Sequence, residues 1–119
     1  MKRLGSSINY AIQGIIFLVK TQRNARFHLV SATVAIILGI WLCVSSMEWI
    51  VISLCITLVI GAEAFNTSLE MLCDTLHPEK HPKIKSVKDL SAAAVLILSI
   101  GALITGLIIF IPKLIAYFK

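Results

Sequence analysis

The feature that constrains this chain most is a run of 22 residues, 90–111, that contains no charged side chain. A helix of about 20 apolar residues is long enough to cross the hydrocarbon layer of a membrane. Residues 29–47 and 49–73 form two further runs of this kind, the second with acids at one end. Hydrophobic residues make up 58% of the 119-residue chain, which excludes an ordinary soluble domain. We therefore predict an all-α integral membrane protein, a single domain over residues 1–119 with three transmembrane helices.

Lysine and arginine are distributed unevenly around the three apolar runs. Five of them precede the first run and four lie between the second and the third, whereas the turn between the first and the second has none. Because positively charged loops stay in the cytoplasm, we expect the N-terminus and the 75–88 segment inside and the C-terminus outside. We expect no cleavable signal peptide, since the first strongly apolar run starts only after Arg26. The net charge of +5 suits anionic lipid headgroups, and no nucleic acid partner is expected, because the basic residues flank spans without interleaved aromatic residues.

Residues 4–20 are too polar to span a membrane, but they carry apolar side chains at helical spacing. We predict an amphipathic helix that lies on the inner membrane surface, with basic residues as anchors at both ends. The repeating apolar positions are Leu4, Ile8, Ile12, Ile15 and Val19.

Three acids and an amide interrupt the second run near its inner end. Glu63, Asn66, Glu70 and Asp74 are spaced 3, 4 and 4 residues apart, so they share one face of a helix. At about 1.5 Å per residue, Glu63 lies about 21 Å from Trp49 and Glu70 about 31 Å, beside a hydrocarbon layer about 30 Å thick. A carboxylate inside a membrane is costly unless it has a partner, so this face is a candidate functional site.

This acidic face can supply much of what phosphoryl transfer requires, namely a base and carboxylate oxygens for a divalent ion. Lys88 and the basic 75–88 segment can supply cations for the phosphates. The chain has no GxxxxGK[ST] motif, so a nucleotide would be bound without a Walker loop. The residues by themselves leave open a lipid-interface enzyme or an ion-coupled transporter with Glu63 as its coupling site. A third alternative is a structural membrane protein in which Glu63 merely pairs with Lys88.

The segment between the second and third runs is expected to be a loop. Pro78 and Pro82 should break any helix within it, which spoils the spacing of its two histidines for zinc. We expect Lys88 at the start of the third helix, where its charge opposes the helix dipole and requires an acidic or anionic partner.

A second group of polar residues precedes the first run. Arg23, Arg26 and His28 suit either phosphate binding or anchoring at the headgroups. The three cysteines lie in or beside apolar runs without CxxC spacing, and we interpret them as small hydrophobic residues.

The pattern ExxNTxxE over 63–70, followed by Asp74 and by Lys88-Asp89, resembles the signature of the small prokaryotic diacylglycerol kinase family, which includes the undecaprenol kinases. The resemblance covers essentially the whole chain, including Arg-Asn-x-Arg-x-His at 23–28. It implies a homotrimer with sites shared between neighbouring chains, in the inner membrane of a bacterium. It also implies transfer of the γ-phosphate of ATP, with Mg²⁺, to a lipid hydroxyl: diacylglycerol to phosphatidic acid or, alternatively, undecaprenol.

The resemblance also assigns roles to individual residues. It makes Glu70 the general base and a metal ligand, with Gln22 as a second metal position. Glu63 and Asn66 would shape the metal and phosphate site. The nucleotide would be bound by Gln22, Asp74, Glu79, His81, Lys88 and Asp89, and phosphate or substrate would be positioned by Arg3, Arg23 and Arg26.

Two positions depart from the family pattern. Gln22 stands where the family usually has Glu, and an amide is a poorer ligand for Mg²⁺ than a carboxylate. Ser91-Ala92 replaces a Gly-Ser-like pair, which moves a hydroxyl by one residue. These departures leave open a weakened or inactive relative.

Overall fold

The computed structural model describes residues 2–119, which form four helices. Three of these helices are long and apolar enough to cross a membrane, so the all-α architecture with three membrane-crossing helices is confirmed. The helices are α1 (Lys2–Thr21), α2 (Arg23–Trp41), α3 (Ser46–Leu76) and α4 (Pro82–Phe118).

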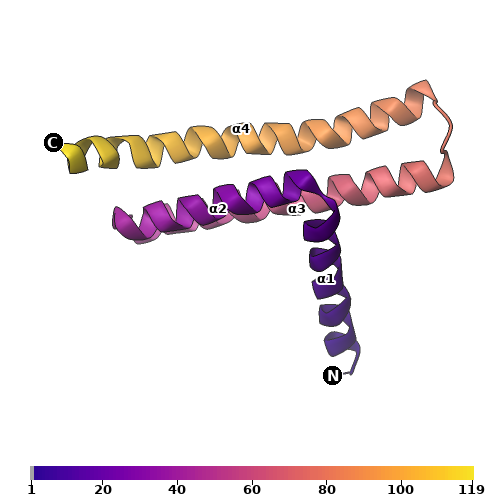
Figure 1. The fold of residues 1–119 in the computed structure, drawn as a ribbon, viewed down its shortest axis with the longest axis horizontal. Helices are drawn as coiled ribbons and strands as arrows, with labels where there is room; N and C mark the ends of the chain where they lie inside the picture. Colours follow the sequence, from indigo (N-terminus) through magenta and orange to yellow (C-terminus); the bar gives the residue numbers. More distant parts are fainter. Residues whose placement is uncertain (1) are drawn as a thin grey trace.

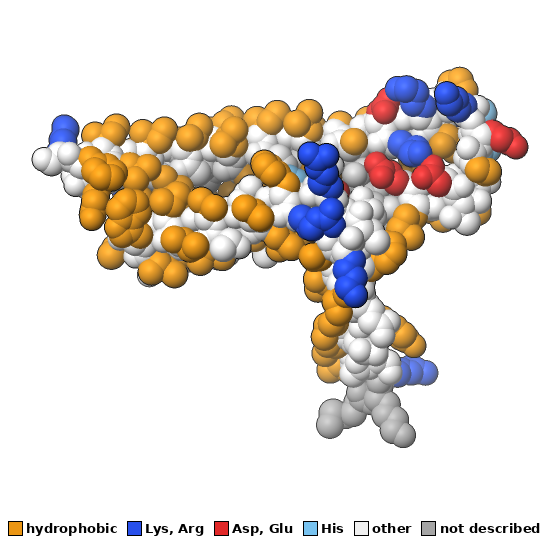
Figure 2. All heavy atoms as spheres, in the orientation of Figure 1, with side chains coloured by type: hydrophobic (Ala, Val, Ile, Leu, Met, Phe, Trp, Pro, Cys, Tyr) orange, Lys and Arg blue, Asp and Glu red, His pale blue; other side chains and the backbone are white. Residues whose placement is uncertain are grey.

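The three apolar helices run side by side, and α1 projects away from them (Figure 1). Helix α3 packs against both α2 and α4 and is the centre of the bundle. The α3–α4 hairpin extends beyond the start of α2 (Figure 1). Charged side chains gather at the tip of this hairpin and at the corner between α1 and α2 (Figure 2). Apolar side chains cover much of the remaining visible surface. The location of α1 on the inner membrane surface remains a prediction.

Helix α2 ends at Trp41, six residues before the boundary expected at 47. The N–H of Val44 donates to the carbonyl of Gly39 at 3.1 Å, and the N–H of Cys43 donates to that of Ile40 at 3.4 Å. These two bonds form a Schellman motif, which needs a left-handed residue after the helix. Cys43 takes that conformation with φ 55°, although glycine is the usual residue there.

The loop between α3 and α4 is shorter than expected, because Pro82 starts a helix instead of breaking one. Proline has no N–H to leave unpaired in the first turn of a helix. The side chain of His81 caps this helix by accepting from the N–H of Lys83 at 3.1 Å. Only residues 77–81 remain non-helical, and the expectation of a loop over 75–88 was wrong. Lys88 consequently lies in the second turn of α4, so the argument from the helix dipole does not apply to it.

Both helices of the hairpin exceed the expected spans of 49–73 and 90–111. Helix α3 has 31 residues and α4 has 37, which correspond to about 46 Å and about 55 Å at 1.5 Å per residue. A hydrocarbon layer is about 30 Å thick. The hairpin is therefore long enough to cross the membrane and still reach well into water.

The end of the bundle opposite the hairpin loop is fixed by polar and apolar contacts. Ser45 and Glu48 form a capping box at the start of α3. The ammonium of Lys113 on α4 lies 3.1 Å from the Glu48 carboxylate. A small buried cluster at this end joins α3, α4 and the turn before α3: Ile52, Ile109, Phe110 and Val44.

We predict that Gly39→Ala destabilises the bundle, because the indole ring of Trp49 covers Gly39. A β-carbon at this position would lie 2.6 Å from Cη2 of Trp49 and within 3.1 Å of two more ring atoms. Overpacking of this kind costs about 1–3 kcal/mol. Thermal unfolding in detergent should show a lower Tm for this variant.

Gly61→Ala is the matched control, because a β-carbon at Gly61 has nothing within 4 Å. Replacing an interior helical glycine by alanine favours the helix by up to about 1 kcal/mol. Equal Tm values for the two variants would contradict the predicted contact with Trp49.

Candidate active site

The polar face of α3 runs from a fully buried acid to an exposed one. Glu63 is 2% exposed, Asn66 is 7% exposed, and Thr67 beside them is 4% exposed. Glu70 is half-buried and Asp74 is exposed. The face predicted from the sequence therefore leads from the interior of the bundle towards the hairpin tip.

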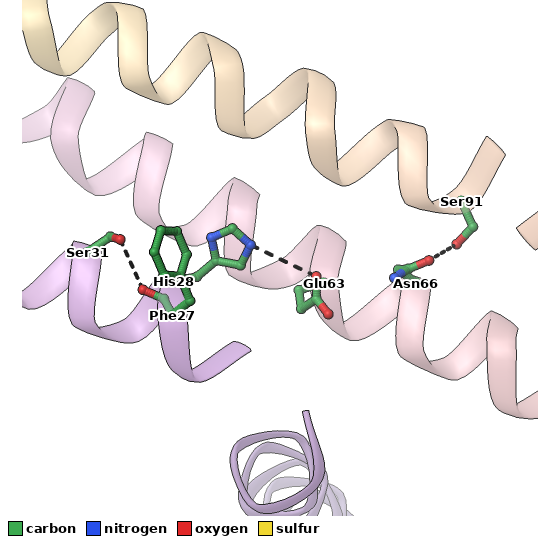
Figure 3. Close-up of polar contacts among 6 residues, drawn as sticks. All are labelled: Phe27, His28, Ser31, Glu63, Asn66 and Ser91. Carbon is green, nitrogen blue, oxygen red and sulfur yellow. Dashed lines mark hydrogen bonds and ion pairs between the residues drawn. The ribbon is translucent and has the colours of Figure 1, made fainter. Parts of the chain in front are cut away.

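Glu63 lies next to His28 of α2, and its carboxylate is incompletely paired (Figure 3). Nε2 of His28 is 4.0 Å from Oε2 of Glu63, which is too long for a hydrogen bond. That oxygen is buried without a hydrogen-bond partner among residues 2–119. A buried carboxylate oxygen in this state is costly, so Glu63 has a strong tendency to interact with a group from outside the chain.

The structure does not pair Glu63 with Lys88, which removes the main contact expected of a purely structural protein. Nζ of Lys88 instead lies 2.6 Å from Oδ1 of Asp74, so the acidic partner expected for this lysine is Asp74. Neither Glu63 nor Glu70 pairs with a lysine or arginine of the described chain.

A second side-chain bond joins α3 to α4 deeper in the bundle. The hydroxyl of Ser91 donates to Oδ1 of Asn66 at 2.7 Å (Figure 3). Together with the Lys88–Asp74 pair, this bond brackets Glu70 along α3. Both contacts fix the register between α3 and α4 around that carboxylate.

The remaining residues assigned to the nucleotide lie around the hairpin tip. Asp89 is paired with Lys85 at 2.6 Å on the exposed surface of α4. The ring of His81 is engaged as the cap of α4, and the carbonyl of Glu79 lies 2.9 Å from Nδ1 of His77. Glu79, His81 and Asp89 thus lie in or just after the loop between α3 and α4, at one end of the fold and apart from Glu63.

The three arginines have different positions. Nη1 of Arg26 donates to the carbonyls of Val19 and Lys20, at 2.9 and 3.1 Å, and so caps the C-terminus of α1. Arg23 is exposed at the start of α2. Arg3 lies in the first turn of α1, whose N-terminal end projects away from the bundle (Figure 1).

An apolar groove of about 590 Å³ runs between α2, α3 and α4. His28 lies at its edge, so the groove passes beside Glu63. Its lining elsewhere is almost entirely aliphatic or aromatic, as in Phe27, Val59 and Leu103.

Comparison with known proteins matches residues 9–110 to the family described as prokaryotic diacylglycerol kinase. The chain belongs to this family. It is 35% identical over 114 residues to the undecaprenol kinase of Bacillus subtilis (strain 168), which covers 96% of this chain and 93% of that protein. It is 33% identical over 111 residues to the diacylglycerol kinase of Synechocystis sp. (strain ATCC 27184 / PCC 6803 / Kazusa), which covers 92% of this chain and 63% of that protein. The chain is therefore a lipid kinase, as the sequence pattern indicated, and the alternative of an ion-coupled transporter is not favoured.

The carboxylates of this lipid kinase suit a divalent ion that is bound partly by the protein and partly by a substrate. They do not suit a metal site built from protein ligands alone. Among residues 2–119, no three His, Cys, Asp or Glu side chains gather to hold a metal ion. Mg²⁺ usually takes one or two protein carboxylates and completes its shell with phosphate oxygens and water. Glu70, half-buried and without a lysine or arginine partner in the described chain, suits that use.

Gln22 reaches the depth of Glu70 in this kinase. Six residues separate it from His28, or about 9 Å along a helix, and seven separate Glu63 from Glu70, or about 10.5 Å. Because α2 and α3 are antiparallel neighbours with His28 beside Glu63, both displacements point towards the cytoplasmic end expected for this bundle. The side-chain nitrogen of Gln22 donates to the Thr21 hydroxyl at 3.3 Å, whereas its side-chain oxygen Oε1 accepts no hydrogen bond from residues 2–119.

The sequence analysis missed two features of this site. His28 was considered only for phosphate or headgroups, and its contact with Glu63 depends on how α2 and α3 pack. Thr67 received no role, although its hydroxyl is buried without a partner among the described residues. Its position next to Asn66 in the ExxNTxxE pattern was the available signal.

Proposed function

We propose that the protein transfers the γ-phosphoryl group of ATP, with Mg²⁺, to the hydroxyl group of a membrane lipid. The observation that carries this proposal is the incompletely paired carboxylate of Glu63, buried within a membrane-crossing helix whose next acids lead out to water. Such a face can meet a lipid hydroxyl at one end and a soluble nucleotide at the other. The apolar groove beside Glu63 suits a hydrocarbon chain that carries this hydroxyl.

Glu63 and Glu70 lie at different depths, which suits them to different chemical roles. The lipid hydroxyl arrives from the membrane side, so the deeper Glu63 is the better general base. Glu70, about 10.5 Å nearer the hairpin tip, is the better metal ligand, with Gln22 at a similar depth along the bundle. This differs from the role implied by the resemblance, in which Glu70 is the base, and the two assignments have different consequences in mutants.

The reaction needs only one proton transfer to the protein. The hydroxyl proton of the lipid passes to Glu63, the lipid oxygen forms a bond to the γ-phosphorus, and the bond from that phosphorus to the bridging oxygen of ADP breaks. Lys88 is placed to neutralise nucleotide phosphates when they displace Asp74 from it. Glu79, His81 and Asp89 are the further candidates for nucleotide contact at the hairpin tip.

We further propose that the protein works as a homotrimer in a bacterial inner membrane, with its N-terminus in the cytoplasm and its C-terminus outside. Glu63 and Glu70 have no lysine or arginine partner within residues 2–119. A neighbouring subunit can supply one, for example its exposed Arg23. Shared sites of this kind would make activity depend on assembly.

Undecaprenol is our first candidate for the lipid, ahead of the diacylglycerol named first in the sequence analysis. The match to the undecaprenol kinase extends over 93% of that protein, whereas 63% of the diacylglycerol kinase is covered. Purified protein in detergent should be assayed with radiolabelled ATP, Mg²⁺ and a panel of lipid alcohols. Labelled undecaprenyl phosphate is the expected product. Label in phosphatidic acid instead would favour diacylglycerol, and no labelled lipid at all would contradict the proposed function.

We predict that Glu63→Gln lowers kcat at least 100-fold at saturating Mg²⁺, because a glutamine amide cannot accept the lipid proton. Glu70→Gln should mainly raise the Mg²⁺ concentration that gives half the maximal rate. Glu48→Gln, at the other end of α3, is the control and should retain activity. If Glu70→Gln loses 100-fold at saturating Mg²⁺ while Glu63→Gln keeps its turnover, Glu70 is the base.

We predict that Gln22→Glu lowers the Mg²⁺ concentration for half-maximal rate, since a carboxylate binds Mg²⁺ better than an amide does. The lipid requirement should stay the same. The measurement is a Mg²⁺ titration of activity at saturating ATP and lipid. An unchanged titration curve would show that Gln22 does not face the metal.

A further inference from the structure

We infer that Ser91 is a positioning residue that turns the amide of Asn66 into a hydrogen-bond donor aimed at the transferred phosphoryl group. This inference rests on the proposed function, and it assigns a task to a hydroxyl at a position where the family pattern has none. The observation that carries it is the 2.7 Å bond from the Ser91 hydroxyl to Oδ1 of Asn66 (Figure 3).

The bond determines which way the Asn66 amide faces. A side-chain amide is planar, with an oxygen that accepts and a nitrogen that donates twice. Because Ser91 holds the oxygen against α4, the nitrogen points away from Ser91, from the opposite edge of the amide. That nitrogen donates to no residue of the described chain, and it keeps some accessible surface although Asn66 as a whole is only 7% exposed. Its two N–H groups are therefore available to a ligand.

The surroundings of Asn66 favour this orientation over the reversed one. Glu63 lies three residues before Asn66 and Glu70 lies four residues after it, on the same face of α3. A reversed amide would direct its oxygen towards a region lined by two carboxylates, where acceptors already predominate. With the nitrogen in that place, the face carries a donor between the proposed base and the proposed metal ligand.

A donor in that place suits the reaction. In phosphoryl transfer, negative charge is spread over the three equatorial oxygens of the moving group. A donor that is already aimed at this charge stabilises it without reorganisation. The amide oxygen of Asn66, by contrast, is occupied by Ser91 and is not free to bind a cation. The assignment is thus that Asn66 contacts phosphoryl oxygens and not Mg²⁺.

The test compares Ser91→Ala with Ser53→Ala on α3, ten residues before Glu63. Ser53 is exposed, its hydroxyl makes no hydrogen bond within residues 2–119, and it does not line the apolar groove, so removing this hydroxyl leaves the proposed site intact. We expect Ser91→Ala to lower kcat about tenfold, a smaller loss than the 100-fold or more that follows removal of a catalytic donor. The Mg²⁺ concentration for half-maximal rate should not change, and Ser91→Thr, which keeps the hydroxyl, should restore most of the rate. Ser53→Ala should match the unaltered protein.

Asn66→Asp separates a donor from a metal ligand and does not depend on Ser91 variants. A carboxylate in place of the amide removes the N–H groups and repels phosphate, so kcat should fall at least 100-fold with no gain in Mg²⁺ affinity. An unchanged kcat in Ser91→Ala would overturn the inference. A lower Mg²⁺ requirement in Asn66→Asp would overturn it as well, because Asn66 would then be an oxygen ligand.

One readout is independent of turnover. In ¹⁵N NMR spectra in detergent, the side-chain amide signals of Asn66 should shift in Ser91→Ala and stay in place in Ser53→Ala. Unshifted signals in Ser91→Ala would refute the bond itself. If the proposed function is wrong, the unaltered protein itself will lack lipid kinase activity. If only this inference is wrong, the unaltered protein will be active and the Ser91 and Asn66 variants will not behave as expected.

Discussion

The whole arrangement depends on one buried carboxylate in a membrane-crossing helix. Glu63 is 2% exposed, and its unpaired oxygen lies 4.0 Å from the imidazole of His28. Burying a charge that is not fully paired opposes folding and insertion, so the remaining contacts have to offset that cost. The capping box and the ion pair of Glu48 with Lys113 lie at the far end of the bundle, away from this carboxylate.

The α3–α4 hairpin gives the acidic face its precision. Two side-chain bonds cross between its helices, one from Ser91 to Asn66 and the other from Lys88 to Asp74. They differ in character, because the first is shielded by the bundle and the second is largely exposed. The shielded bond is suited to fixing geometry. The exposed pair is weakly held in water, and so it can be exchanged for another anion at small cost.

The sequence predicted the main elements well and their ends poorly. Long uncharged runs leave few alternatives to membrane helices, so three such helices were predictable. The end of α2 was not predictable, because the left-handed residue of its Schellman motif is Cys43. A glycine at this position would have indicated the end of the helix. The prediction for Pro82 was wrong because proline has two opposite effects. It breaks a helix when it lies in the interior, but it is favoured in the first turn, where Pro82 lies. The 3-4-4 spacing predicted the acidic face, whereas the contact of His28 with Glu63 depends on tertiary packing, which periodicity does not encode.

The length of the hairpin has a consequence for the proposed reaction. Helices of about 46 Å and 55 Å are longer than the hydrocarbon layer of about 30 Å. One continuous side-chain face therefore contacts the hydrocarbon layer, the headgroup region and water in turn. Two reactants that do not dissolve in a common solvent can then meet on that face, each still in its own phase. The protein need not extract the lipid from the bilayer or carry the nucleotide into it, and it avoids the desolvation cost of either transfer.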